Sequence, residues 1–121
     1  MSRRILVIED HEENRRILRD LLTHAHYGML EALTGEEGVA LAETERPDLI
    51  LMDIQLPGLD GYEATRRIKS NPALSHIPII AVTSYALSGD DAKARAAGCY
   101  AYVTKPFSPR ALLAKIREHV P

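Results

Sequence analysis

Two kinds of segment alternate along this chain, and the alternation restricts the possible fold more than any other feature. The first kind is a short apolar run, rich in β-branched residues, that ends at a polar residue. Because these runs lack apolar–polar alternation, they are typical of strands whose two faces are both buried. We predict five such strands, of which the second is the weakest: Ile5–Ile8, Met29–Ala32, Leu49–Met52, Ile79–Val82 and Ala101–Val103.

The second kind of segment carries apolar residues at helical spacing. The predicted helices are Glu12–Ala25, Glu36–Arg46, one that begins after the cap Asp60 and ends at Asn71, Asp90–Ala97, and one that begins with Pro109 after Ser108. The pairs Arg15-Arg16 and Arg66-Arg67 are expected on solvated helix faces. The residues expected to face inward are Ile17, Leu18, Leu21, Leu22 and Ala25 in the first helix, Tyr62, Thr65 and Ile68 in the third, and Leu112, Leu113, Ile116 and Val120 in the last.

This order of elements predicts an α/β fold. Right-handed crossovers between parallel strands give a doubly wound sheet with helices on both faces. The length of 121 residues fits one domain, and we expect residues 1–121 to form a single domain with no output domain. The first strand is not followed by Gly-x-Gly-x-x-Gly and the chain has no Walker-type loop, which argues against binding of dinucleotides or nucleoside triphosphates.

Composition excludes several other classes. Lys and Arg total 15 and Asp and Glu total 17, so the net charge of −2 argues against nucleic acid or an anionic membrane as the partner. The apolar run before Glu9 is too short for a secretory signal, and no run reaches the length of a membrane span, so we expect a cytoplasmic protein. Cys99 is the only cysteine and is interpreted as a small buried residue. The five histidines are scattered and expected to be exposed.

Polar residues directly follow four of the predicted strands. Glu9 and Asp10 follow the first strand, Asp53 the third, Thr83 the fourth, and Lys105 comes just after the fifth. Because the carboxyl ends of parallel strands share one rim, where ligands bind in such sheets, we expect these residues to converge. Three neighbouring carboxylates repel one another and require a cation when all are ionised. Oxygen donors without cysteine or clustered histidine favour Mg²⁺ over zinc.

This rim has the groups that phosphoryl transfer to a carboxylate requires. A carboxylate beside Mg²⁺ and a lysine can attack phosphorus and form an aspartyl phosphate, while the cation and the lysine neutralise the transferring group. Taken singly, Asp53 could be a turn former and Glu9-Asp10 a helix cap. Suitable chemistry at all four strand ends favours the functional interpretation.

Several motifs give the chain a family resemblance over residues 3–120. They are Ile5-Leu-Val-Ile-Glu-Asp10, Pro47-Asp-Leu-Ile-Leu-Met-Asp-Ile-Gln-Leu-Pro-Gly58, Ile79-Ile-Ala-Val-Thr83, Gly98 and Thr104-Lys-Pro-Phe107. On these motifs the chain resembles the response-regulator receiver domains of bacterial two-component signalling, the CheY-like superfamily. The resemblance implies a flavodoxin-like strand order of 2-1-3-4-5.

The resemblance also implies a phosphorylation site. Asp53 would accept the phosphoryl group. Asp10, Asp53 and the backbone carbonyl of Gln55 would bind Mg²⁺, and Glu9 would act mainly through a bound water. Lys105 would pair with the phosphoryl group. Such a domain is a phosphoacceptor, not an enzyme in the ordinary sense, although it assists its own Mg²⁺-dependent phosphorylation and dephosphorylation.

The conformational switch is implied in the same way. Thr83 would move to meet the phosphoryl oxygen, Tyr102 would swing inward behind it, and the Lys105-Pro106 peptide would be cis. The implied partners are a histidine kinase or histidine phosphotransferase and a downstream protein target, with no nucleic acid and no membrane. The domain itself would be a monomer or a weak homodimer.

Among receivers, the chain is similar to single-domain DivK-type cell-cycle regulators, and receivers of hybrid sensor kinases share many of the same features. It departs from the common pattern in a few places. Glu9, His11 and Ser84 replace residues that are more usual at those positions. Gln55 and Tyr85 lie where side chains affect water access, so the lifetime of the phosphorylated form is left open.

Three rival functions fit the sequence less well. A flavodoxin-like cofactor binder would need aromatic rings to enclose a flavin, but the chain has no Trp, one Phe and five Tyr. A phosphohydrolase with an Asp nucleophile would place an acid two residues after Asp53, where Gln55 stands. A pseudo-receiver would have a broken acidic cluster, and here the cluster is intact.

The fourth predicted helix is the expected moving part. Between Leu87 and Cys99 the apolar residues are all alanines, so the helix buries little area and is weakly held. We expect helix Asp90–Ala97 and its flank Ser84–Asp90 to respond to phosphorylation, with Tyr102 exposed on a neighbouring edge strand.

Overall fold

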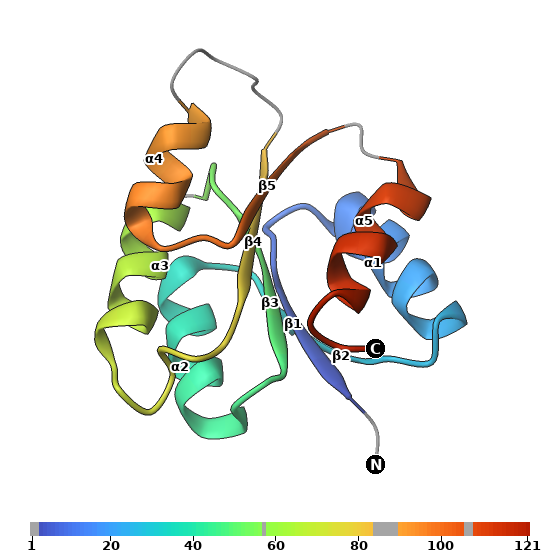
Figure 1. Cartoon of the computed structure of the whole chain (residues 1–121), viewed down its shortest axis with the longest axis horizontal. Coiled ribbons are helices and arrows are strands. Elements are labelled where there is room, and N and C mark those ends of the chain that lie inside the picture. Colours follow the sequence, from blue (N-terminus) through green and yellow to red (C-terminus); the bar gives the residue numbers. More distant parts are fainter. Residues whose placement is uncertain (1–2, 57, 84–89, 106–107) are drawn as a thin grey trace.

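The computed structural model describes residues 3–56, 58–83, 90–105 and 108–121. Within these residues, strands and helices alternate along the whole chain (Figure 1). The elements are β1 (Arg4–Ile8), α1 (Glu12–His24), β2 (Gly28–Ala32), α2 (Gly35–Glu45), β3 (Leu49–Asp53), α3 (Gly61–Ser70), β4 (Ile79–Thr83), α4 (Asp90–Ala97), β5 (Ala101–Thr104) and α5 (Pro109–Arg117). All predicted elements are present, and each end that was predicted lies within one residue of the observed one. The last helix ends earlier than expected, because Val120, predicted to belong to it, lies three residues beyond Arg117.

The five strands form one parallel sheet in the order β2-β1-β3-β4-β5, which confirms the expected topology. Helices α1 and α5 cover one face, and α2, α3 and α4 cover the other (Figure 1). Strand β3 is therefore central, while β2 and β5 lie at the edges. Because every strand runs in the same direction, the strands end at one rim, the upper one in Figure 1.

Two hydrophobic clusters, one on each face, explain why the strands show no alternation. In β1, Ile5 and Val7 pack into the cluster under α1 and α5, whereas Leu6 and Ile8 pack into the cluster under α2, α3 and α4. All four side chains are fully buried. The residues facing either side of the strand must therefore be apolar, which is the pattern of a parallel strand covered on both faces.

Side-chain caps fix where several helices begin. Asp60 accepts a hydrogen bond from the Glu63 N–H, and Ser108 accepts one from the Ala111 N–H. Pro109 occupies the first turn of α5 as predicted. These caps replace partners that the first backbone N–H groups of a helix lack, and they define the starts of α3 and α5.

The inward face of α1 differs from the prediction. Ile17 is 53% exposed, while Arg15 is 8% exposed and lies on the buried face with Leu18 and Leu22. The prediction that Ile17 faces inward and that Arg15 is solvated is therefore wrong. Arg15 can be buried because its guanidinium is paired, donating to the Glu9 carbonyl at 2.9 Å and to Glu12.

Helix α4 is held by little apolar surface, as expected. Its alanines divide between the two environments: Ala94 and Ala97 are buried, and Ala92 and Ala96 are exposed. Cys99, just after the helix, is buried as predicted. The flank 84–89, expected to move with α4, lies outside the described residues.

No helix among the described residues is long and apolar enough to cross a membrane. The cytoplasmic location expected from the sequence stays a prediction.

Replacing Gly61 with alanine should destabilise the fold and disturb the rim. A Cβ atom there would lie 2.5 Å from the Asp53 carbonyl oxygen and 2.6 Å from the Ile54 Cα, both backbone atoms. We expect Gly61→Ala to lower the free energy of unfolding by about 2 kcal/mol, because overpacking forces backbone to shift. Gly28→Ala is the matched control, since its Cβ would meet no atom closer than 3.3 Å. Urea denaturation of both variants tests this, and equal losses would contradict it.

Candidate functional site

The structure brings the predicted strand-end residues together at the upper rim of the sheet. Glu9 follows β1, Asp53 and Thr83 are the last residues of β3 and β4, and Lys105 follows β5. Glu9, Asp53 and Thr83 are 2%, 4% and 2% exposed, so these polar side chains are nearly removed from water. Burial at this depth requires paired or hydrogen-bonded groups.

Lys105 is the ammonium group that lies between the buried carboxylates. Its Nζ donates to Glu9 Oε1 at 2.5 Å and lies 3.6 Å from Asp53 Oδ2. The backbone N–H of Lys105 donates to the Thr83 carbonyl at 2.6 Å, which fixes the chain leaving β5 against β4. The ammonium group therefore contacts one carboxylate closely and stays within reach of the other.

Asp53 receives its hydrogen bond from the backbone. The N–H of Gln55 donates to Asp53 Oδ1 at 3.0 Å. Donor and acceptor are only two residues apart in the chain. The bond therefore orients the carboxyl group without a contact from a distant element. It leaves the Oδ2 side directed toward Lys105.

The carboxylates form a cluster suited to a cation. Single ligand atoms of Glu9, Asp10, His11 and Asp53 all lie within 4.8 Å of one another. Asp10 Oδ1 is buried and makes no hydrogen bond within the described residues. The His11 ring nitrogen lies 3.2 Å from this oxygen. A buried carboxylate oxygen that accepts no hydrogen bond is a position that a divalent cation would satisfy. The residues present therefore fit a hard, oxygen-ligated cation such as Mg²⁺.

The pKa values of the two buried carboxyl groups, Glu9 and Asp53, are shifted in opposite directions. Burial raises the pKa of Asp53, and the negative charge of Glu9 raises it further. The hydrogen bond from the Gln55 N–H lowers this pKa, but the net value is about 6, compared with an ordinary 3.8. Burial also acts to raise the pKa of Glu9, but hydrogen bonds from Lys105 and His11 outweigh it and lower the value to about 2. Glu9 thus holds the lysine, and Asp53 is left undercompensated.

Sequence reasoning missed the residue that holds the end of β1. Arg15 donates to the Glu9 carbonyl at 2.9 Å, and its Nε lies 3.3 Å from Glu31 Oε1 on β2. Arg19 pairs with the same Glu31 through two hydrogen bonds. Helix α1 is thereby tied to the edge strand and to the backbone immediately before Asp10. The oppositely charged partners are far apart in sequence, so local pattern gave no signal for them.

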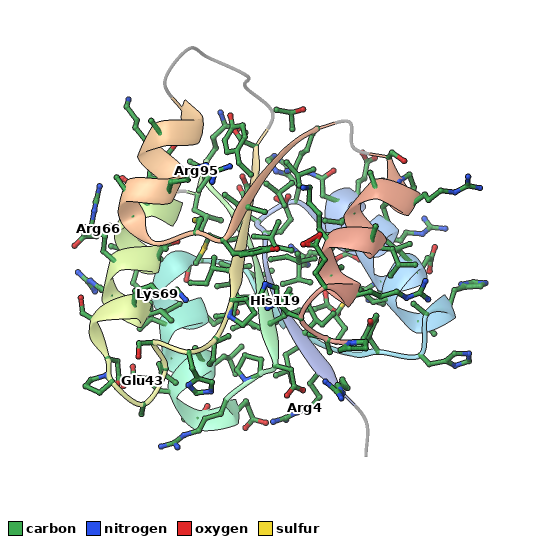
Figure 2. The ribbon with its side chains drawn as sticks, viewed as in Figure 1. Arg4, Glu43, Arg66, Lys69, Arg95 and His119 are labelled. Atoms are coloured by element: carbon green, nitrogen blue, oxygen red, sulfur yellow. The ribbon has the colours of Figure 1, made fainter. Side chains whose placement is uncertain are left out.

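The other predicted site residues have mixed outcomes. Tyr102 is half-buried and packs against the cluster under α3 and α4, so the prediction that it is exposed on β5 is wrong. Together with Arg95, Tyr100, Ala101 and Lys115 it lines a hollow of about 400 Å³ beside α4 and α5. Figure 2 labels Arg95 on α4 and His119 after α5, on either side of β5. Ser84, Tyr85, Pro106 and Phe107, and hence the expected cis peptide, lie outside the described residues.

The parallel sheet in the order β2-β1-β3-β4-β5 and the acidic rim are features of a receiver-type signalling domain. Residues 5–117 match the family model for the response regulator receiver domain, and the chain belongs to that family. It is 41% identical over 120 residues to the polar-differentiation response regulator DivK of Brucella anthropi, covering 99% of this chain and 98% of that protein. The resemblance to DivK-type regulators is confirmed at this level.

Solved structures of receiver domains are similar to this chain. The receiver domain of sensor histidine kinase PA1611 from Pseudomonas aeruginosa is 36% identical, with a TM-score of 0.91 and coverage of 99% of this chain and 98% of that one. That structure has a magnesium ion coordinated in its active-site cleft. A CheY-like receiver domain protein from Methanospirillum hungatei is 34% identical, with a TM-score of 0.87 over 98% and 93% of the two chains.

The free energy of unfolding should depend on the charge of Asp53. In the folded chain this group binds its proton more tightly than in the unfolded chain, so stability declines as pH rises from 3.8 to about 6. We expect Asp53→Asn in EDTA to be more stable than wild type by about 3 kcal/mol above this window and to lose that advantage below pH of about 4. Mg²⁺ should narrow the difference at neutral pH by stabilising the wild type.

Chemical denaturation across this pH range measures the effect. Asp20→Asn is the matched control, because Asp20 is an exposed aspartate on α1 and its charge has no buried neighbour to repel. A constant difference between Asp53→Asn and wild type at every pH would contradict the assignment.

Proposed function

We propose that this domain accepts a phosphoryl group on Asp53 from a histidine kinase or histidine phosphotransferase and passes the signal to a protein target. The observation that carries the proposal is the position of Asp53. It is a 4% exposed carboxylate at the end of the central strand, 3.6 Å from Lys105 and clustered with two further acids. A carboxylate that is buried but not fully compensated is suited to act as a nucleophile when a cation is bound.

Asp10, Asp53 and the backbone carbonyl of Gln55 would hold Mg²⁺, with Glu9 contributing through water. The support is the buried Asp10 Oδ1, which makes no hydrogen bond within the described residues, and the closeness of the ligand atoms. Bound at this place, Mg²⁺ supplies positive charge that offsets the carboxylates and the phosphoryl oxygens.

The reaction is a displacement at phosphorus. One Asp53 oxygen forms a bond to phosphorus while the bond from phosphorus to the donor's imidazole nitrogen breaks, and the nitrogen keeps the electron pair. Lys105 is within reach of the new phosphoryl oxygens and can exchange its contact with Glu9 for one with them. Hydrolysis of the product by water, assisted by the same residues, is part of the proposal.

The output surface would be α4, β5 and α5. Phosphorylation adds negative charge and strong acceptors beside Thr83 and Lys105. The Lys105 N–H donates a hydrogen bond to the Thr83 carbonyl, so movement at the end of β4 is transmitted to the end of β5, and the reverse. Behind them lies α4, which is held by the buried side chains of Ala94 and Ala97. Weak packing makes this helix easy to displace, and Tyr102 lies beside it.

The phosphohydrolase alternative is not favoured. An acid two residues after the nucleophile would be needed to move protons, and Gln55 stands there. The Gln55 backbone instead orients Asp53. The alternative that this receiver comes from a hybrid sensor kinase predicts the same chemistry at Asp53.

Incubation with acetyl phosphate and Mg²⁺ should add about 80 Da to the intact mass, the mass of one phosphoryl group. Asp53→Asn should show no addition, and the surface variant Asp20→Asn should behave as wild type. Omitting Mg²⁺ and adding EDTA should abolish the gain. A gain that persists in Asp53→Asn would refute Asp53 as the acceptor.

Lys105→Ala should separate metal binding from the switch. Since Lys105 is not a proposed metal ligand, we expect Mg²⁺ affinity to be retained, whereas the phosphorylation-driven change is lost. Hydrogen exchange with and without beryllofluoride, a phosphoryl mimic, measures that change across α4 and β5. Unchanged protection of residues 90–104 in the wild type would contradict the proposed output surface.

A further inference from the structure

One histidine stands apart from the four others because it adjoins the acidic cluster. His11 Nδ1 lies 3.2 Å from Asp10 Oδ1 and 3.4 Å from Glu9 Oε2. The remaining histidines are exposed elsewhere on the surface, as the sequence predicted. The site therefore offers a nitrogen donor beside its carboxylate oxygens.

The spacings suit ligands of one ion. In an octahedral site with bonds of about 2.1 Å, adjacent ligand atoms lie about 3.0 Å apart and opposite ones about 4.2 Å apart. The two distances from His11 are close to the adjacent value, and the whole group spans 4.8 Å. Small side-chain rotations are enough to bring these atoms to one centre. Asp10 Oδ1, buried without a hydrogen bond among the described residues, already faces this space.

The backbone holds His11 beside the cluster, and the ring is not needed to cap helix α1. His11 is the N-cap of α1, and its side chain makes no capping hydrogen bond. Its N–H donates to Glu9 Oε2 at 3.1 Å, which fixes the Cα beside the cluster. The ring itself is 69% exposed, so it can turn toward an incoming ion at little cost in packing.

We infer that His11 is a metal ligand and that it shifts the selectivity of this site from Mg²⁺ toward first-row transition metals. The inference rests on the proposed function, because Asp10 and Asp53 would also hold Mg²⁺. Lys105 occupies Glu9 Oε1, so the donors most available are Asp10, Asp53 and the imidazole.

The donor set gives this selectivity a direction. Mg²⁺ prefers oxygen ligands and keeps several waters, so it gains little from an imidazole. Imidazole suits Ni²⁺, Zn²⁺ and Cu²⁺, and the affinity of nitrogen and oxygen sites rises from Mn²⁺ through Co²⁺ to Ni²⁺. The contribution of His11 should therefore be largest for Ni²⁺, smaller for Mn²⁺ and negligible for Mg²⁺.

Calorimetric titration of the full, tag-free chain, stripped of metal with EDTA and dialysed, tests this inference. Mg²⁺ and Ni²⁺ are titrated into wild type, His11→Asn and His11→Ala. Asparagine is a good N-cap and keeps the start of α1, whereas alanine removes every side-chain donor. His24→Asn is the control, since His24 is an exposed histidine at the other end of α1.

We expect both His11 variants to raise the Kd for Ni²⁺ at the site at least about tenfold and to change the Kd for Mg²⁺ less than about twofold. The control should match wild type. Pulsed electron paramagnetic resonance of bound Mn²⁺ should show coupling to a nitrogen nucleus in wild type and none in His11→Ala.

The outcomes separate the two proposals. Unchanged Ni²⁺ affinity in the His11 variants, with normal Mg²⁺ binding, overturns the role of His11 and leaves the proposed function intact. An equal loss in His24→Asn also overturns it, because surface imidazoles would then be the ligands. Failure of wild type to bind Mg²⁺ would instead contradict the proposed function.

Discussion

Glu9, Asp10 and Asp53 bring three carboxyl groups to one rim, and Lys105 is the ammonium group placed among them. Two of these acids are almost completely buried, so their repulsion is only weakly screened by water. The hydrophobic core makes this arrangement tolerable. Strands β1 and β3 are packed on both faces, and their ends cannot separate to relieve the charge without exposing apolar residues.

The backbone that carries these acids is held by contacts that do not involve the Asp53 carboxyl group. Arg15 binds the backbone at Glu9, and Gly61 lets α3 pack directly on the backbone of Asp53 and Ile54. The Lys105 backbone joins β5 to the end of β4. The rim is therefore rigid on the β1 and β3 side. Beside β4 and β5 lies α4, whose buried side chains are those of Ala94 and Ala97 among the described residues, and we propose that a change of charge at Asp53 is relieved in that direction.

Much of this could be predicted from the sequence because it follows from local pattern. The buried strands, the caps Asp60 and Ser108, and the convergence of Glu9, Asp53, Thr83 and Lys105 all follow from spacing and from parallel topology. The rotation of α1 about its axis could not be predicted in this way, because the spacing of apolar residues placed Ile17 on the buried face. What decides that rotation is the pairing of Arg15 with Glu9 and Glu31, which are brought to it by the fold. His11 was likewise grouped with scattered histidines, since its closeness to Asp53 exists only after β1 and β3 pair.

Asp53 is a buried carboxyl group whose negative charge is only partly offset by Lys105, and we propose that a bound cation completes the compensation. The most direct test is carbon-13 NMR titration of the Asp53 side-chain carboxyl group, in EDTA and again with Mg²⁺. We predict a pKa of about 6 without metal and a marked fall when Mg²⁺ is present, because the cation favours the ionised form. An ordinary pKa near 3.8 that Mg²⁺ leaves unchanged would contradict the account.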